Sequence, residues 1–241
     1  LIKITTSIDA GTPETFKKVR GRPKFYNVFE NLRSYSKVDP TKITIKYIFT
    51  EENYDEKEID GFVDNCKKYE LDKCNFQISL NYKNSQLEFN ILKSIAYLFS
   101  KLHDKGIKKI FLDDHIMLRF GSLKNDELDK IKFYLSKYDS KQVLLDPNQI
   151  KDLIIYGAGN IATEIIKKTN FFKKIKNFDI VDGDLKNQGK MLFGKKIMSP
   201  NLIKKDNRGI FIATAQAYDD VYKNILEMKG HDKNIISGLI V

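Results

Sequence analysis

A glycine-containing turn between a strand pattern and a helix pattern is the part of this sequence whose chemistry is easiest to specify. Gly157-Ala158-Gly159-Asn160-Ile161-Ala162 follows the apolar run Leu153–Tyr156 and opens a helix expected over Ile161–Lys168. In such a turn the first glycine permits the bend, the second lets the backbone approach a phosphate, and the small last residue allows close helix–strand packing. The free N–H groups at the helix start then face an anion. The residues expected to contact a nucleotide are Gly157, Ala158, Gly159, Asn160 and Ile161.

Two further polar residues follow neighbouring strand patterns. Asp182 comes directly after Phe178–Val181 and lies 25 residues beyond Gly157, an interval at which a carboxylate can accept hydrogen bonds from ribose hydroxyls. Thr214 follows a third strand pattern, Ile210–Ala213, and joins the expected site. The alternative is a tight strand–helix turn that binds nothing. Nucleotide binding would not by itself imply hydride transfer.

The first half of the chain also carries polar residues at the ends of its strand patterns. Ser7 and Asp9 end the first pattern, 113–115 (Asp-Asp-His) follows the fourth, and Lys46 lies inside the second. A charge within a strand is unusual unless it faces a cavity or a carboxylate. Simpler alternatives exist for each: Ser7 and Asp9 could cap a helix opening at Thr12, Lys46 could extend its amine to solvent, and 113–115 could form a solvated loop.

The elements that would position these residues follow a strand–helix repetition. The strand patterns of the first half are Ile2–Ile8, Ile43–Phe49, Asn75–Leu80 and Ile107–Leu112. Between them lie helical patterns at Thr12–Val19, from Phe25 to before Pro40, across Ile59–Cys66 and near Ser85–His103. A strand regularly followed by a helix implies parallel strands with helical crossovers, whose carboxyl ends gather the functional groups. The expected class is α/β, with either a partial (β/α) barrel or an open parallel sheet in this half.

A second domain follows a boundary expected near residue 150. A helix at Asn125–Tyr138 and a polar stretch at Asp139–Asn148 lead into it. The second half has three strand patterns, a helix at Tyr218–Lys229 that Gly230 can end, and a last apolar run at Ile235–Val241. We therefore expect a partial (β/α) domain over 1–122, a helix and linker over 123–150, and a small three-layer nucleotide-binding domain over 151–241.

Composition excludes several classes of protein. The 241 residues include 41% hydrophobic ones, which is enough for packed cores, and no apolar run reaches the roughly 18 residues of a membrane span. The net charge is +10, but only five of the 42 basic residues are arginine, and the charge is spread over both halves, which argues against a nucleic-acid partner. The two cysteines, Cys66 and Cys74, and three scattered histidines suit neither a metal site nor a disulfide framework. They indicate a reducing, cytoplasmic compartment.

The second half resembles the Rossmann-like domains of bacterial sugar-modifying and surface-polysaccharide proteins, including the amino-terminal domain of sugar O-acyltransferases. The resemblance rests on 155–160 (Ile-Tyr-Gly-Ala-Gly-Asn), 181–184 (Val-Asp-Gly-Asp), Gly189, 194–197 (Gly-Lys-Lys-Ile) and 199–200 (Ser-Pro). It implies that Gly157, Gly159, Asn160 and Asp182 meet a nucleotide or a nucleotide-sugar. NAD(P) is the other cofactor that such a glycine turn can hold.

The first half resembles part of the radical S-adenosylmethionine enzymes. Residues 5–21 (TTSIDAGTPETFKKVRG) look like the stretch that follows the fourth barrel strand of that family, and 43–53 (ITIKYIFTEEN) is similar to its next strand. The resemblance covers roughly residues 1–120 and implies that Ser7 and Asp9, and less directly Lys46, line an S-adenosylmethionine site. The family's cluster motif, C-x-x-x-C-x-x-C, does not occur in this sequence, so the 4Fe-4S cluster and the radical step would belong to a longer protein.

Together these features predict a fragment of a radical S-adenosylmethionine protein with a carboxyl-terminal nucleotide- or nucleotide-sugar-binding domain. The sequence starts without methionine and inside a strand pattern, which favours a piece of a longer chain. Such a fragment would not be catalytically competent alone, and domain analogy suggests surface-carbohydrate biosynthesis. Two alternatives stay open: a small NAD-dependent oxidoreductase, and a non-catalytic regulatory or scaffold module.

Overall fold

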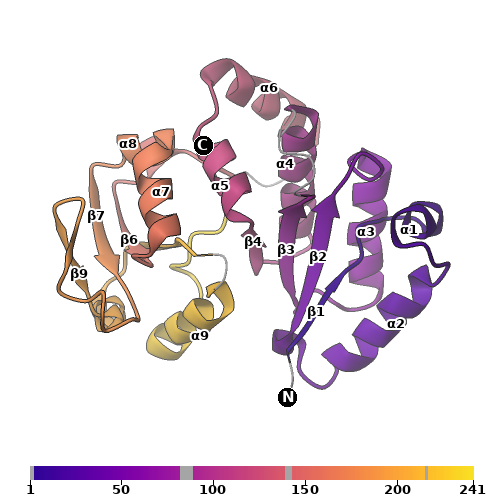
Figure 1. Cartoon of the computed structure of the whole chain (residues 1–241), viewed down its shortest axis with the longest axis horizontal. Coiled ribbons are helices and arrows are strands. Elements are labelled where there is room, and N and C mark those ends of the chain that lie inside the picture. Colours follow the sequence, from indigo (N-terminus) through magenta and orange to yellow (C-terminus); the bar gives the residue numbers. More distant parts are fainter. Residues whose placement is uncertain (1–2, 82–88, 139–142, 215–216) are drawn as a thin grey trace. The chain divides into compact units, whose positions relative to one another are not determined.

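The computed structural model describes residues 3–81, 89–138, 143–214 and 217–241, which form two compact units (Figure 1). Unit 1 comprises residues 1–116 and 124–143, and unit 2 comprises residues 117–123 and 144–241. Both units combine parallel sheets with helices, which confirms the expected α/β class.

Unit 1 is built on a four-stranded parallel sheet in the order β1-β2-β3-β4. The strands are β1 (Ile4–Ser7), β2 (Ile43–Phe49), β3 (Asn75–Leu80) and β4 (Ile110–Leu112). The helices are α1 (Pro13–Arg20), α2 (Phe25–Ser36), α3 (Glu56–Lys68), α4 (Phe89–Asp104) and α6 (Asn125–Leu135), with a short 3-10 helix, η1 (Pro40–Lys42), before β2. Because the strands follow one another in sequence order, right-handed crossovers place the helices on one face. Figure 1 shows α1, α2 and α3 on the same side of the sheet.

The helix-covered face of this sheet holds the apolar core of unit 1. Tyr47 of β2 and Phe76 of β3 both pack edge-on against Phe62 of α3. Since side chains alternate along a strand, their strand neighbours point to the opposite face. That second face is polar, unlike the apolar faces usual for parallel sheets. Register places on it Thr5 and Ser7 of β1, Thr44, Lys46 and Ile48 of β2, Gln77 and Ser79 of β3, and Phe111 of β4.

The backbone of the loop after β1 packs directly against the backbone of α3. A Cβ at Gly11 would lie 1.9 Å from the carbonyl oxygen of Glu58, and a Cβ at Gly61 would lie 2.5 Å from the carbonyl oxygen of Gly11. Only glycine fits at these two positions, because any side chain would push the loop away from the helix.

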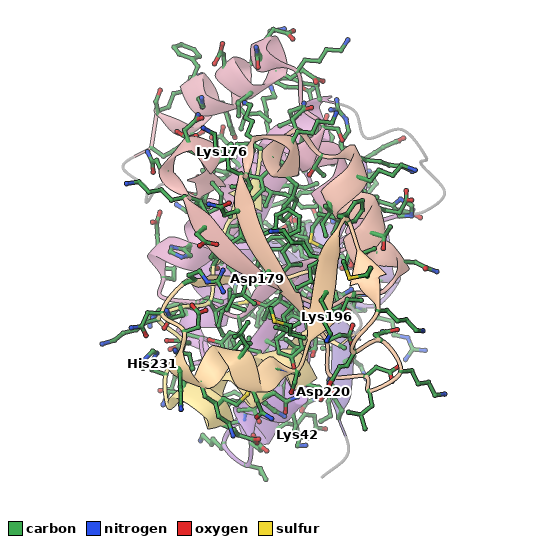
Figure 2. The ribbon with its side chains drawn as sticks, turned by 90° about the vertical axis from the view of Figure 1, so that its left-hand side faces the viewer. Lys42, Lys176, Asp179, Lys196, Asp220 and His231 are labelled. Atoms are coloured by element: carbon green, nitrogen blue, oxygen red, sulfur yellow. The ribbon has the colours of Figure 1, made fainter. Side chains whose placement is uncertain are left out.

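Unit 2 is built on a five-stranded sheet in the order β10-β6-β7-β9-β8, in which only β8 is antiparallel. The strands are β6 (Asp152–Tyr156), β7 (Asn177–Val181), β8 (Met191–Leu192), β9 (Lys195–Met198) and β10 (Gly209–Ile212). The helices are α7 (Asn160–Lys168), α8 (Asn170–Lys174), the 3-10 helix η3 (Pro200–Lys205) and α9 (Tyr218–Lys229), and Gly230 ends α9 at a φ of 73°. In Figure 2, Lys176 before β7 and Asp220 on α9 lie toward opposite ends of unit 2.

The segment between the two halves differs from the expected linker. Residues 139–142 lie outside the described residues, but Leu144–Leu145 forms strand β5, which pairs with β11 (Leu239–Ile240), and η2 (Pro147–Gln149) follows it. Residues 144–150 belong to unit 2, in which β5 pairs with the end of the last apolar run. Helix α5 (Asp114–Gly121) was not anticipated from the sequence, and residues 117–123 belong to unit 2.

Several element ends also differ from expectation. β1 and β4 are shorter than their patterns: β1 ends at Ser7 and β4 begins at Ile110, while Ile8 and Ile107 are buried just beyond these strand ends. Ile2 and residues 85–88 lie outside the described residues. Within the described parts of the chain, no helix is long and apolar enough to cross a bilayer.

Candidate functional site

The glycine turn of unit 2 has the backbone conformation that its sequence predicts. Gly157 has a φ of 115°, in the region that side-chain-bearing residues rarely adopt, and its N–H donates to the carbonyl of Val181 at 2.8 Å. This hydrogen bond ties the turn that follows β6 to the end of the neighbouring strand β7. Ala162, 1% exposed, lies in the first turn of α7 and supplies the close packing that a larger residue would prevent.

The amino end of α7 has no side chain to cap it. Its cap residue is Gly159, and no side-chain hydrogen bond is made to the first turn in the described structure. A Cβ at Gly159 would meet no atom within 4 Å, so packing within the chain does not require glycine there. Asn160 is exposed and Ile161 is half-buried at the start of the helix. The open approach and the N–H groups of the first turn suit an anion.

Asp182 lies at the end of β7, where its carboxylate engages the glycine turn directly. Oδ2 accepts the N–H of Ala158 at 2.7 Å, and Oδ1 accepts the N–H of Asp184 at 2.7 Å. The acid expected to meet a ribose therefore also holds the turn in place. Each carboxylate oxygen can accept a second hydrogen bond, so these bonds leave room for ligand hydroxyls.

Thr214 and the glycine turn meet where the strand order reverses. β6 pairs with β7 on one side and with β10 on the other, and a Cβ at Gly157 would lie 3.5 Å from the carbonyl oxygen of Ala213 and 3.9 Å from Cγ2 of Thr214. The Thr214 hydroxyl accepts the N–H of Ala217 at 3.3 Å. Open parallel sheets bind ligands at the carboxyl ends of strands flanking such a reversal. The structure thus brings Gly157, Ala158, Asp182 and Thr214 to one edge of the sheet.

A pocket that the sequence did not indicate lies beside this edge. It has a volume of about 320 Å³ and is bordered by residues that end or follow β6, β7 and β9 and by one side of α9. Its polar lining residues are Tyr156, Gln188, Ser199, Asn201, Asn224 and Glu227. Three of the stretches that carry the resemblance of the second half contribute to this lining: 155–160 through Tyr156, 181–184 through Gly183, and 199–200 through both of its residues.

In unit 1, Asp9 is buried and bonded within the chain. It is 3% exposed and has a φ of 54°, its Oδ1 accepts the N–H of Ile48 at 2.7 Å, and its Oδ2 pairs with the Arg20 guanidinium. Burial raises the pKa of Asp9 to about 6, against the opposing effects of the Ile48 N–H, Arg20 and Lys46. Neither Asp9 nor Ser7 caps α1. Thr12 is its cap residue.

The start of α1 is instead held by Glu58, a residue the sequence did not single out. Glu58 is 4% exposed, and its carboxylate accepts the N–H groups of Gly11 and Thr12 and the hydroxyls of Thr12 and Thr15, at 2.6 to 3.1 Å. Four donors on one carboxylate fix the loop that carries Asp9.

Ser7 stands in a row of side chains across the polar face of unit 1. Register aligns it with Lys46 of β2 and Gln77 of β3. Gln77 donates through Nε2 to Oδ1 of Asp113 at 2.8 Å. The expectation of a solvated loop at 113–115 is wrong, because Asp113 is buried and Asp114 begins helix α5.

The side chains that most often bind metal ions are not clustered in the described parts of the chain. No group of three or more His, Cys, Asp or Glu side chains among the described residues could hold an ion. Cys66 and Cys74 are free and buried, and burial raises the pKa of both thiols, that of Cys74 to about 12. Protonated, desolvated thiols are poor metal ligands.

Comparison of the chain with family models, with curated proteins and with solved structures finds no match. The geometry of the sites is therefore what bears on function.

Proposed function

We propose that unit 2 binds a nucleotide or a nucleotide-sugar, with the phosphates at the amino end of α7. The observation that carries this proposal is the position of the glycine turn: Gly157, at positive φ, stands where β6 separates β7 from β10. The crevice at such a reversal is where open α/β sheets take their ligands. The resemblance to Rossmann-like domains of sugar-modifying proteins supports the same ligand class.

Different residues of this site contact different groups of the ligand. The uncapped first turn of α7 offers N–H groups to phosphate oxygens, and Gly159 lets the backbone come close. Asp182 accepts ribose hydroxyls while it keeps its bond to Ala158. Asn160 and Thr214 supply polar groups at the rim.

A second candidate function concerns the polar face of unit 1. Ser7, Lys46 and Gln77 lie side by side on it, and the buried hydroxyls of Thr44 and Ser79 have no hydrogen-bond partner in the described structure. Buried hydroxyls without partners favour a face that contacts a polar ligand. With the resemblance to radical S-adenosylmethionine enzymes, we propose that this face forms one wall of an S-adenosylmethionine site in a longer protein.

An iron–sulfur cluster does not fit the residues of this chain. The two cysteines are the only ones in the sequence, both are buried, and their raised thiol pKa disfavours the thiolate that iron needs. No reaction step through such a cluster is assigned to the chain.

Isothermal titration of the full chain tests the nucleotide site. We expect a nucleoside diphosphate, a nucleotide-sugar or NAD(P) to bind with micromolar affinity, and Gly159→Val to weaken binding at least tenfold because its side chain fills the phosphate approach. Lys167→Val, which places the same side chain at an exposed position two turns along the same helix, is the matched control. Binding of NAD(P) alone among these ligands would favour a small NAD-dependent oxidoreductase over a nucleotide-sugar-binding domain. If no phosphate-bearing nucleotide binds to the folded chain, the proposal fails and the scaffold alternative stands.

A further inference from the structure

The hairpin formed by β8 and β9 presents apolar side chains to solvent at the edge of the unit 2 sheet. β8 is the last strand in the order of that sheet, and β9 lies beyond β7 in Figure 1. Met191 of β8 is 65% exposed and Phe193, in the hairpin loop, is 43% exposed. Leu185, in the turn that precedes the hairpin, is 80% exposed. Single exposed apolar residues are ordinary, but three within nine positions of the chain indicate a contact site.

Phe193 occupies a backbone conformation that a bulky residue rarely adopts. Its φ is 50° and that of Gly194 is 72°, so both residues of the hairpin loop have a positive φ. Loops of this kind favour Asn-Gly, because asparagine tolerates the left-handed region and an aromatic residue does not. Burial does not hold Phe193 there, since nearly half of its surface meets solvent. A strained backbone at an exposed position points to a role other than folding.

The same segment is strongly basic. Residues 185–196 (LKNQGKMLFGKK) contain four lysines and no acidic residue. The exposed lysines are Lys186, Lys190 and Lys196. Strand pairing places Met191 directly opposite Lys196, so an apolar side chain and an amine share one face of the hairpin. The exposed apolar residues and the positive charge therefore belong to one surface.

The charge of this surface narrows the class of partner. Lysines on an edge strand can keep two sheets from pairing edge to edge, but exposed Met191 and Phe193 would promote the contact that such lysines prevent. A second copy of the chain is disfavoured as the partner, because a symmetric contact would bring two sets of four lysines together with no acid in either segment. The segment fits an anionic partner that also accepts apolar side chains.

A lipid bilayer with acidic headgroups has both properties. Apolar side chains enter it at the boundary between headgroups and acyl chains, and its negative surface attracts lysines. Nucleic acid fits less well. The segment has no arginine to bind phosphates through two hydrogen bonds, and only one of its exposed apolar side chains is an aromatic ring on which a base could stack.

We propose that residues 185–196 form a membrane-contact hairpin, in which Leu185, Met191 and Phe193 enter the headgroup region of an anionic bilayer and the lysines bind its acidic headgroups. The contact is peripheral and reversible, since it combines a few apolar side chains with a small number of charges. It lies outside the first turn of α7 and does not depend on the ligand proposed for the glycine turn.

Co-sedimentation of the full chain with lipid vesicles tests the proposal. One set of vesicles is phosphatidylcholine alone, and the other is a three-to-one mixture of phosphatidylcholine and phosphatidylglycerol. We expect binding to the acidic vesicles to be at least tenfold stronger than to the neutral ones. It should be largely lost at about 0.5 M salt, where exposed charges are screened within about 4 Å. Equal binding to both sets, or binding to neither, overturns the proposal.

Two variants assign the binding to the hairpin. Phe193→Asn creates the Asn-Gly pair that the loop favours, so the chain should be no less stable while its binding to acidic vesicles falls at least threefold. The double substitution of Lys190→Gln and Lys196→Gln should lower binding at least tenfold, because each lysine near an anionic surface contributes roughly a factor of five.

Matched controls make the same chemical changes elsewhere. Phe133→Asn removes an aromatic ring of α6 that is 71% exposed, and the double substitution of Lys204→Gln and Lys205→Gln removes two exposed lysines of η3. Each control should keep binding within twofold of the wild type. If the controls lower binding as much as the hairpin variants do, the net charge of the chain attaches it rather than this hairpin, and the proposal is overturned.

Tryptophan fluorescence tests insertion itself. The chain has no tryptophan, so Phe193→Trp introduces a single reporter, whose emission should shift to shorter wavelength on acidic vesicles. Phe133→Trp should show no shift. An emission from Phe193→Trp that acidic vesicles leave unchanged overturns the proposal. A change caused by single-stranded RNA but not by vesicles would assign the hairpin to nucleic acid, and dimerisation that Phe193→Asn abolishes would assign it to a second copy; either result overturns the membrane contact.

Discussion

The carboxylate of Asp182 and the backbone N–H of Ala158 form a 2.7 Å hydrogen bond that links the end of β7 to the turn after β6. The two residues are 24 positions apart in sequence, and the bond couples the acid of the proposed ribose site to the turn of the proposed phosphate site. A ligand that engages one would meet the other already in position.

Removal of this carboxylate should loosen the turn. In Asp182→Ala, the N–H groups of Ala158 and Asp184 lose their acceptor, at a cost of about 1 to 2 kcal/mol in unfolding free energy. Asp182→Asn keeps one acceptor oxygen and should lose less. Hydrogen exchange of the Ala158 amide measures the effect directly, and it should speed up about tenfold or more in Asp182→Ala. Unchanged exchange would mean that the bond does not hold the turn.

Glu58 should be among the most sensitive residues of unit 1. Glu58→Ala leaves four donors without an acceptor, two of them backbone N–H groups at the start of α1. We expect a loss of about 3 kcal/mol in unfolding free energy, measured by urea denaturation. The control is Glu14→Ala, an exposed acid in the first turn of α1, which should cost less than about 0.5 kcal/mol. Equal losses for the two variants would contradict this role.

Local sequence patterns were enough to predict the long elements. The bounds of β2, β3 and α9 match their patterns, because each has an apolar repeat of the right period and a clear stop, such as Gly230 after α9. The glycine turn was also predictable, since the positive φ of Gly157 follows from its place between a strand and a helix. In these cases the information lies within a few residues of the element itself.

Features that depend on distant partners were not predictable. β8 and β9 have two and four residues and form a hairpin at the edge of the sheet, too short to show a repeat. α5 begins at Asp114, among the charged residues of 113–115, and reads as a loop from the local pattern. The role of Glu58 requires a loop 47 residues away. The pocket beside the glycine turn is assembled from four segments that no single spacing relates.

Arg208 should stabilise the sheet of unit 2 through three carboxylates. Its guanidinium donates to Asp152 at 2.9 Å, to Asp179 at 2.7 Å and to Asp206 at 2.7 Å. Hydrogen bonding to Arg208 lowers the pKa of Asp206. Arg208→Met leaves three carboxylates close together without their cation, and we expect the unfolding free energy to fall by about 2 kcal/mol at pH 7. This loss is smaller than that for a fully buried ion pair, because the three aspartates are partly exposed.

The pH dependence identifies the cause of that loss. A carboxyl group whose pKa is lowered by folding stabilises the folded state above its unfolded pKa, and this contribution disappears as the pH falls. The loss of unfolding free energy caused by Arg208→Met should therefore become smaller as the pH falls toward 3. Arg33→Met, which breaks an exposed pair with Glu70, should cost less than about 0.5 kcal/mol at either pH. A deficit independent of pH would assign the loss to packing rather than to charge.

Asp9 should give unit 1 a pH dependence of the opposite sign. Burial raises its pKa to about 6, above the value of about 4 expected for an unfolded chain. The folded state then holds its proton over the window between these two values, so stability is greatest below about pH 4, decreases as the pH rises from about 4 to about 6, and levels off above that. The contribution of Asp9 should fall by about 2 kcal/mol between pH 4.5 and 7.5.

Asp9→Asn isolates this contribution from all other titrating groups. An asparagine can still accept the N–H of Ile48, but it carries no charge to desolvate, and Arg20 is exposed enough to be hydrated when its partner is neutral. The unfolding free energy of the variant relative to the wild type should therefore rise by about 2 kcal/mol from pH 4.5 to 7.5, with little further change above pH 7.5. Urea denaturation at four or five pH values measures the difference. A difference that stays constant would mean that the pair with Arg20 offsets the cost of burial, and that Asp9 is ionised throughout this range.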